Sequence, residues 1–428
     1  MRPPSGPQEA SNSRFGWRSV FAVSVFVLVA ALVVAVRGYE TRRTASEGSS
    51  GTLVVNVTSG ADRGPGTLRE ALFVVATASS SAQIVLEAPH ITVETALPPI
   101  VNSRGVTVTA QTDHGLIDAH ALGEGPVFDV AAPNTTFDGV TVNGCPAAAI
   151  LVRAGRFHVH GATLSGCDVG VDVAGNANDL LIERNHFVDD RLGVRFAAAT
   201  RNSAVIGNEF SGERDAGVWA VRSEPDLKGA PFTVRDNRFD HDHAGIVAGN
   251  IPILIERNEL LASSESAVHL IGAGAIVRGN RVSGGSSFGI VAEGAREAVI
   301  EGNELDGVAA YGIMVRGSSN ALVRSNRVHR CGYGLAFVLG DARNPSTAVD
   351  NVIIEPSYDG IDVIGDSPIL RRNQVLHPHA LALRVSDFQP PGGAQAITAT
   401  PYLDGNQFGG ATARIAANGS VYPTVHPR

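Results

Sequence analysis

The sequence has little of the chemistry that nucleic acids and soft metals require. Lys228 is the only lysine, and 34 basic residues face 42 acidic ones, for a formal net charge of −8. An acidic chain is a poor match for nucleic acid, so we expect no such partner. Three cysteines are too few for a disulfide framework, and their spacing matches no zinc signature. Two methionines add little for soft metals.

Charge and aromatic content are also low. Charged residues make up 18% of the chain and aromatic residues 6%, while hydrophobic residues reach 44%. This hydrophobic content excludes a disordered chain, and the 48 glycines follow no collagen period. A chain of 428 residues can hold two or three ordinary domains or one elongated repeat array. In either case an apolar core must stabilise it.

A single uncharged apolar segment, 19–36, is just long enough to cross a bilayer as a helix. A membrane anchor and a cleaved signal peptide are the two interpretations. The long leader, and the lack of a small-x-small site directly after Val36, favour the anchor. We predict a cytoplasmic tail at 1–18, a single-pass anchor at 19–36, a flexible linker at 37–51 and an extracytoplasmic domain. Without residues 1–50, 28 basic residues face 39 acidic ones, so the domain's surface is acidic.

A repeat of about 23 residues organises the rest of the chain. Its marker is an Asn followed two positions later by an apolar residue, at Asn185, Asn208, Asn237, Asn258, Asn280, Asn303, Asn326, Asn351 and Asn373. A small residue and an aliphatic one follow, as at Gly289-Ile290, and an apolar alternation precedes the Asn. A period of two indicates strands, and repetition without helical stretches predicts a β-solenoid. Asn tolerates left-handed turn geometry, so we expect Asn ladders at a turn.

Two columns of charge support this register. Directly after the Asn, the series runs Glu209, Arg238, Glu259, Arg281, Glu304, Arg327; two residues before it, the series runs Arg235, Glu256, Arg278, Glu301, Arg324. Residues at one position of neighbouring turns lie roughly 4.8 Å apart, so alternating signs stabilise the stack. We interpret these ladders as structural.

The segment before the repeats carries a further signal. Thr52 to Thr58 predicts a strand, and Thr67 with Glu70 forms a capping box that opens an amphipathic helix, 68–78. The sequence Gly-Thr-Leu-Arg-Glu-Ala-Leu at 66–72, with the downstream repeats, resembles right-handed parallel β-helix proteins of the pectate-lyase-like type. The resemblance covers about residues 52–410. We therefore predict an all-β, single-stranded right-handed parallel β-helix with an N-terminal capping helix and a C-terminal tail at 411–428.

The three cysteines share one position of the repeat. Cys145 and Cys167 fall on adjacent turns, close enough for a disulfide, although a stacked pair of thiols is equally compatible. Cys331 lies far along the axis and is expected to be free.

Three successive turns carry acidic residues where other turns have small ones. Asp190, Glu213 and Asp242 stack, which costs stability unless a cation, a proton or neighbouring arginines offset the repulsion. One interpretation is a solvated acidic turn balanced by Arg191 and Arg214. The other is a Ca²⁺ site, since oxygen-rich sites favour this ion; its ligands would be Asp190, Glu213, Asp215 and Asp242.

The strands that follow these turns in successive repeats present a candidate groove. Its outward positions are Asp172, Arg195, Trp219 and His269, and an exposed Trp beside charged groups suits a sugar ring. The loop 223–230 would wall this groove. A second irregular patch on the same side contains His329, Arg330, Tyr333, Glu355, Tyr358, Asp359, Asp362, His377 and His379. A long polymer along the solenoid would touch both.

The resemblance implies polysaccharide chemistry, because enzymes of this fold act as lyases, hydrolases or uronate C5-epimerases. Proton abstraction needs a base, for which His241 or His243, beside Asp240, is the candidate, and a cation such as Arg191, Arg195 or Arg214. Trp219, His269, Asp172 and Arg214 are the predicted substrate contacts. Hydrolysis needs two carboxylates, which Asp189, Asp215 and Asp240 would supply.

We therefore expect a monomeric, membrane-anchored protein that binds an acidic polysaccharide. Lyase or epimerase activity is one hypothesis. A non-catalytic carbohydrate-binding or structural cell-surface module is the second, and a glycoside hydrolase is the third.

Overall fold

The computed structural model describes residues 51–111, 115–175, 177–198, 200–222, 231–273, 275–285, 287–392, 394–409, 414–417 and 420–423. The predicted tail at 1–18, the anchor at 19–36 and the linker up to residue 50 lie outside these residues, as does the loop 223–230. Within the described ranges, no helix is both long and apolar enough to cross a membrane.

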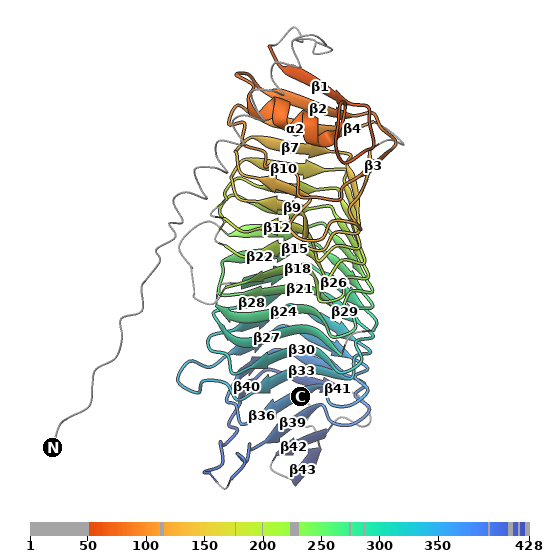
Figure 1. Ribbon diagram of the computed structural model, residues 1–428. Coiled ribbons are helices and arrows are strands. Elements are labelled where there is room, and N and C mark those ends of the chain that lie inside the picture. Colours follow the sequence, from red (N-terminus) through yellow and green to blue (C-terminus); the bar gives the residue numbers. More distant parts are fainter. Residues whose placement is uncertain are drawn as a thin grey trace, which may run out of the picture. The chain divides into compact units, whose positions relative to one another are not determined.

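The described strands wind into a solenoid of three parallel sheets (Figure 1). From Val106 to Ala417, successive strands enter the three sheets, called A, B and C, in rotation, so each turn in this range adds one strand to each sheet. Among the described strands, only β42 (Arg414–Ala417) and β43 (Ser420–Pro423) at the C-terminal end pair antiparallel. The parallel solenoid predicted from the repeat is confirmed.

Each sheet stacks short strands in sequence order. Sheet A contains β1 (Leu53–Val57), β2 (Ala82–Leu86), β4 (Val106–Ala110), β7 (Thr135–Asp138), β10 (Phe157–His160), β13 (Leu181–Glu183), β16 (Ala204–Ile206), β19 (Phe232–Arg235), β22 (Ile253–Glu256), β25 (Ala275–Arg278), β28 (Val299–Glu301), β31 (Leu322–Arg324), β34 (Thr347–Val349), β37 (Ile369–Arg371) and β40 (Tyr402–Asp404). Sheet B contains β3 (His90–Thr92), β5 (Leu116–Asp118), β8 (Thr141–Asn143), β11 (Thr163–Ser165), β14 (His186–Val188), β17 (Glu209–Ser211), β20 (Arg238–Asp240), β23 (Glu259–Leu261), β26 (Arg281–Ser283), β29 (Glu304–Asp306), β32 (Arg327–His329), β35 (Val352–Ile354), β38 (Gln374–Leu376) and β41 (Gln407–Gly409). Sheet C contains β6 (Phe128–Val130), β9 (Ala148–Val152), β12 (Val169–Val173), β15 (Leu192–Phe196), β18 (Ala216–Val221), β21 (Ala244–Gly249), β24 (Ser266–Ala273), β27 (Phe288–Arg296), β30 (Tyr311–Arg316), β33 (Tyr333–Val338), β36 (Ile361–Ile364), β39 (Leu383–Ser386), β42 (Arg414–Ala417) and β43 (Ser420–Pro423).

The recurring Asn residues form a buried ladder at the turn from sheet A to sheet B. Asn280 Nδ2 donates to Ile255 O and to Asn303 Oδ1, both at 3.0 Å, and Asn303 repeats the pattern one turn later. The left-handed residue of this turn is the one before the Asn, for example Gly279 at φ 61°. The prediction of a ladder is confirmed, but its stated reason is corrected, because the Asn contributes hydrogen bonds and its predecessor makes the turn.

Glycines in sheet C permit large side chains in the core. A Cβ at Gly193 would lie 2.6 Å from Phe210 Cδ1 and 2.7 Å from Gly217 O on the next turn. Inside the solenoid Phe187, Phe210 and Phe239 stack with ring centroids 4.7 Å apart. The recurring Gly-aliphatic pair is therefore a packing requirement.

Helix α2 (Leu68–Ala76) begins where the capping box predicts it. Thr67 accepts a hydrogen bond from Glu70 N at 3.3 Å, and Glu70 Oε2 accepts one from Gly66 N at 2.5 Å. Leu68, Leu72 and Val75 are each 1% exposed and belong to the main core. The helix packs beside β1 and β2 at the N-terminal end of the solenoid (Figure 1).

Both predicted charge ladders have the expected register. Arg235, Glu256, Arg278, Glu301 and Arg324 are successive partners in sheet A. The series from Glu209 to Arg327 does the same in sheet B.

A disulfide joins Cys145 and Cys167, which settles the alternative left open by the sequence, and Cys331 is free and buried. At the other end, β42 continues sheet C into the segment predicted to be a tail. The solenoid therefore extends beyond residue 410.

Candidate functional site

An aromatic ladder runs along the outer face of sheet C in its C-terminal half. Phe288, Tyr311 and Tyr333 are register partners on β27, β30 and β33, each just before the glycine of its strand. Centroids lie 6.0 Å apart between Phe288 and Tyr311, 4.6 Å between Tyr311 and Tyr333, and 5.1 Å between Tyr333 and Tyr358. Tyr358 ends the ladder and is 53% exposed. The stacked rings thus form a row on the solenoid surface.

Two carboxylates and one arginine lie beside this ladder. Asp359 is 1% exposed and accepts hydrogen bonds from Leu381 N at 3.0 Å and from Arg384 Nε at 2.6 Å. Asp362, on β36, is the register partner of Arg384 on β39 and is 4% exposed. Its Oδ1 is buried without a hydrogen-bond partner. Arg384 therefore donates its hydrogen bond to Asp359, and Asp362 Oδ1 receives none from the described residues.

The pKa values around the ladder follow from this burial. Burial, and then the charge of Asp359, raise the pKa of Asp362 to about 6, against a smaller opposing effect of Arg384. The pKa values of Tyr311 and Tyr333 are raised by burial and by these carboxylates. A carboxyl that titrates near neutrality beside partly buried tyrosines is typical of a binding or reactive site.

Part of this site lies in the second irregular patch of the sequence, which contains Tyr333, Tyr358, Asp359 and Asp362. Phe288, Tyr311 and Arg384 were not predicted. The signal for the two rings was present, since each occupies the residue before a repeat glycine.

The first predicted groove has a different character. Asp172, Arg195 and Trp219 do stack as register partners, and Val247 separates Trp219 from His269. Arg195 binds Asp172 with two hydrogen bonds, of 2.8 and 2.6 Å. Trp219 is half-buried against an outer apolar cluster of Ala148, Val169, Leu192, Ala216, Ala244 and Val247. The exposed Trp beside free charges is therefore corrected to a packed Trp beside a satisfied ion pair.

The other predicted cations and bases are also engaged. Arg191 bridges Asp168 at 2.6 Å and Asp215 at 2.8 Å, and Arg214 Nη2 donates to Cys167 O at 3.4 Å. His241 Nδ1 lies 2.5 Å from Asp240 Oδ1, His243 Nε2 lies 3.0 Å from Glu265, and His269 Nε2 lies 3.4 Å from Glu293. The first pair brings two predicted catalytic residues, His241 and Asp240, together, whereas His243 and His269 each pair with a different glutamate.

The predicted calcium ligands do not converge. Asp190, Glu213 and Asp242 are each 0–1% exposed, whereas Asp215 pairs with Arg191 at the surface. In the described part of the chain no three His, Cys, Asp or Glu side chains are placed to hold a metal ion. The calcium site therefore remains a sequence prediction without an assembled ligand set.

The three inward carboxyls instead form a second buried ladder. Asp190 Oδ1 accepts from Cys167 N at 2.7 Å, and Asp242 Oδ1 accepts from Glu213 N at 2.9 Å. Four buried oxygens have no hydrogen-bond partner among the described residues: Asp190 Oδ2, both carboxyl oxygens of Glu213, and Asp242 Oδ2. Burial raises the pKa of all three, that of Asp242 to about 7, and the neighbouring carboxylates raise that of Glu213 further. The raised pKa values favour protonation as the way in which this repulsion is offset, while the charge of Arg214 lowers the pKa of Asp190.

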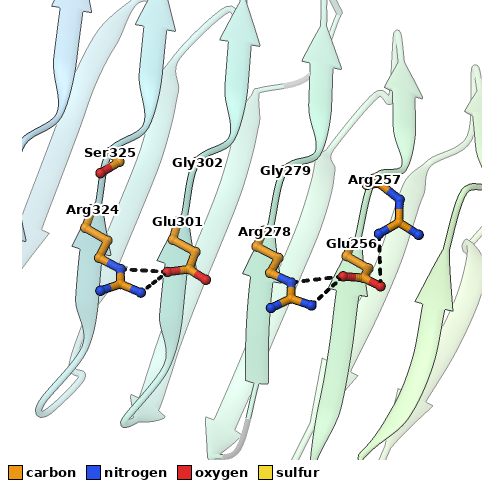
Figure 2. A pocket seen from close by; sticks show the side chains of 8 residues that line it. All are labelled: Glu256, Arg257, Arg278, Gly279, Glu301, Gly302, Arg324 and Ser325. Atoms are coloured by element: carbon orange, nitrogen blue, oxygen red, sulfur yellow. Dashed lines mark hydrogen bonds and ion pairs between the residues drawn. The ribbon is translucent and has the colours of Figure 1, made fainter.

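A shallow groove of about 530 Å³ lies over sheet A and its turn to sheet B. Figure 2 shows its alternating charges, with Arg278 bonded to Glu256 at 2.7 and 2.9 Å and Arg324 Nε bonded to Glu301 at 2.6 Å. Gly279 and Gly302 also line it. Because these charges satisfy one another, the groove is the predicted structural ladder seen from outside.

Residues 224–375 match the protein-family profile described as right handed beta helix region. The chain is a right-handed parallel β-helix protein. Residues 100–269 of this β-helix also match the profile described as periplasmic copper-binding protein (NosD). No curated protein matches the chain in sequence.

Two solved structures are similar to this β-helix. The catalytic unit of a GH87 α-1,3-glucanase from Streptomyces thermodiastaticus is 16% identical, with a TM-score of 0.55 over 86% of this chain and 71% of that one. A mutant tailspike protein of Escherichia coli bacteriophage HK620, in complex with a hexasaccharide, is 12% identical, with a TM-score of 0.55 over 87% and 84%. These likenesses show the fold.

The residues present do not fit copper. Copper(I) favours Cys and Met sulfur, but Cys145 and Cys167 are consumed in a disulfide and Cys331 is buried. Met314 is the only methionine among the described residues, and these residues form no metal-binding group. We therefore derive no copper chemistry for this β-helix.

Proposed function

We propose that this β-helix binds a polysaccharide along the outer face of sheet C, at the aromatic ladder of its C-terminal half, whose Tyr311, Tyr333 and Tyr358 form the tyrosine ladder. The observation that carries the proposal is Tyr358, which is 53% exposed and ends the ladder beside the Asp359, Asp362 and Arg384 cluster. An open aromatic ring packs against the apolar face of a sugar, while the polar groups bind its hydroxyls.

The site suits a polymer better than a small ligand. Its rings sit on consecutive turns, which repeat at roughly 4.8 Å along the solenoid axis. The turns of Tyr311, Tyr333 and Tyr358 can thus each present one phenol to successive units of an extended chain. The tailspike of the same fold was solved with a hexasaccharide, which supports a glycan as ligand.

Tyr358→Ala is expected to weaken oligosaccharide binding by about tenfold, because it removes the exposed ring that ends the ladder. Calorimetric titration of the full chain with a panel of neutral, acidic and amino oligosaccharides measures this. Tyr402→Ala is the matched control, since Tyr402 is 55% exposed but lies on sheet A. Equal weakening by both substitutions would contradict the proposal.

The enzyme hypotheses can be followed in the same samples. Lyases and epimerases must break the C5–H bond of a uronate, and exchange of that proton in heavy water reports the step. We propose binding as the function and keep this chemistry as the alternative, because a His that pairs with a carboxylate, as His241 does with Asp240, can still act as a base. Exchange that disappears in His241→Ala or His243→Ala would instead support lyase or epimerase activity. New reducing ends without exchange of the C5 proton would support a hydrolase, because a lyase also frees a reducing end but breaks the C5–H bond.

We also propose that the β-helix lies outside the cytoplasm, anchored through residues 19–36. The Cys145–Cys167 disulfide suits an oxidising compartment, and the second matching family is described as periplasmic. Fractionation of cells that express the full chain, or the chain without 19–36, tests this. Recovery of the full chain in the soluble cytoplasmic fraction would contradict it.

A further inference from the structure

The tyrosine ladder site has one carboxylate too many. The charged groups that the described elements bring to it are Asp359, Asp362 and Arg384, and the phenols of Tyr311, Tyr333 and Tyr358 complete its titratable set. Arg384 is committed to Asp359, with Nε and Oδ2 2.6 Å apart. With both acids ionised, one negative charge remains without a counter-ion.

That charge belongs to Asp362. The carboxyl is 4% exposed, its Oδ1 has no hydrogen-bond partner, and it makes no ion pair within the described residues. A buried carboxylate without a partner carries a large desolvation cost, which a proton or a bound cation must offset. In the preceding turn its register partner is Ala336, which offers no polar group.

The rings favour a cation as well. The face and hydroxyl oxygen of a tyrosine carry negative potential, and an ammonium group close to such a ring is attracted by it. Asp359 and Asp362 also favour a cation, because their negative potential reaches the rings. The same potential raises the pKa values of Tyr311 and Tyr333. An anionic ligand would meet repulsion from all of these groups.

We infer that the glycan bound here carries protonated amino groups, one of which lies over the tyrosine ladder and offsets the charge of the buried Asp362. This inference rests on the proposed function and changes its ligand class, because the sequence alone predicted an acidic polysaccharide. The ligand is then an amino sugar polymer, and a polyuronate is disfavoured at this site.

The test compares three oligosaccharide probes on the full chain by calorimetry at pH 8. The first is a hexamer of N-acetylglucosamine. The second is a glucosamine hexamer of the same length in which each nitrogen carries three methyl groups in place of the acetyl group, so that its positive charge is fixed. The third is a hexamer of galacturonate. The trimethylated hexamer is expected to bind about tenfold more tightly than the acetylated one, because its fixed positive charge attracts the Asp362 carboxylate and the tyrosine faces. Its preference should fall on going from pH 8 to pH 5, because Asp362 takes up a proton with a pKa of about 6.

Asp362→Asn keeps the size of the side chain and is expected to abolish both the preference and its pH dependence. Asp350→Asn is the matched control, since Asp350 is an aspartate on another face, paired with Arg372. Thermal unfolding of both variants checks that they fold. An Asp362→Asn variant that retains the preference would overturn the inference.

Equal binding of the cationic and acetylated hexamers, with Tyr358→Ala weakening both, would overturn the amino-sugar inference and leave glycan binding standing. Binding of none of the three probes would count against both. Tighter binding of the galacturonate hexamer would overturn the inference in favour of the acidic ligand.

Discussion

The triple variant Asp190→Asn, Glu213→Gln and Asp242→Asn is expected to be more stable than the natural chain at pH 8, and the difference should shrink towards pH 4. In the folded protein these carboxyls are buried and their pKa values are raised. In the unfolded chain they ionise near pH 4. Between those two pKa values the folded state holds more protons than the unfolded one, so stability falls as pH rises.

The size of this effect follows from the same linkage. Each carboxyl costs up to about 1.4 kcal/mol of unfolding free energy per pH unit within its window. Asp242, with a pKa of about 7, should alone remove on the order of 2 kcal/mol between pH 5 and pH 7. Amides retain the shape of the ladder, supply donors for the unpaired oxygens and do not ionise.

Chemical denaturation of the natural chain and the triple variant, at several pH values, measures this difference. Asp215→Asn is the matched control, because Asp215 lies on the same turn but pairs with Arg191 at the surface. It should not stabilise the protein. Parallel stability curves for the natural chain and the triple variant would show that these carboxyls are not held protonated by the fold.

Asn280→Ala is expected to destabilise the solenoid by about 3 kcal/mol. Asn280 Oδ1 accepts from the backbone N and the side-chain Nδ2 of Asn258, and its Nδ2 donates to Ile255 O and Asn303 Oδ1. The substitution leaves these groups unpaired in the interior and opens a small cavity. Each buried orphan costs about 1–3 kcal/mol.

The control for the Asn ladder is Asn344→Ala. In the natural chain the Asn344 side chain donates a hydrogen bond to Asp341 in an exposed turn. It should change the unfolding free energy by less than about 0.5 kcal/mol. Equilibrium denaturation compares the two variants. Equal losses would mean that the ladder contributes no more than a surface turn.

The sequence predicts the register well because the repeat carries it in several independent columns. The Asn series, the Gly-aliphatic series and the alternating charges all give one alignment of turns, and the strand partners follow it. The helix at Leu68–Ala76 was predictable from Thr67 and Glu70. These features are local or periodic, so no tertiary information is needed.

The site was harder to predict because register does not specify which polar groups satisfy one another. The sequence aligned Asp172 and Arg195 correctly. The same alignment lets these two side chains bind each other, so neither charge is left to bind a ligand. Asp190 and Asp215 differ by burial, which depends on the direction of each side chain in the turn. The lone Asp362 emerges only because Arg384 reaches Asp359 instead.

The most direct test of the central claim is hydroxyl-radical footprinting of the full chain with and without a bound oligosaccharide. The account predicts reduced oxidation of Tyr358 and Tyr333 on binding, with Tyr402 on sheet A and Trp219 in the N-terminal half unchanged. Protection of Trp219 or Tyr402, with Tyr358 still fully oxidised, would contradict it.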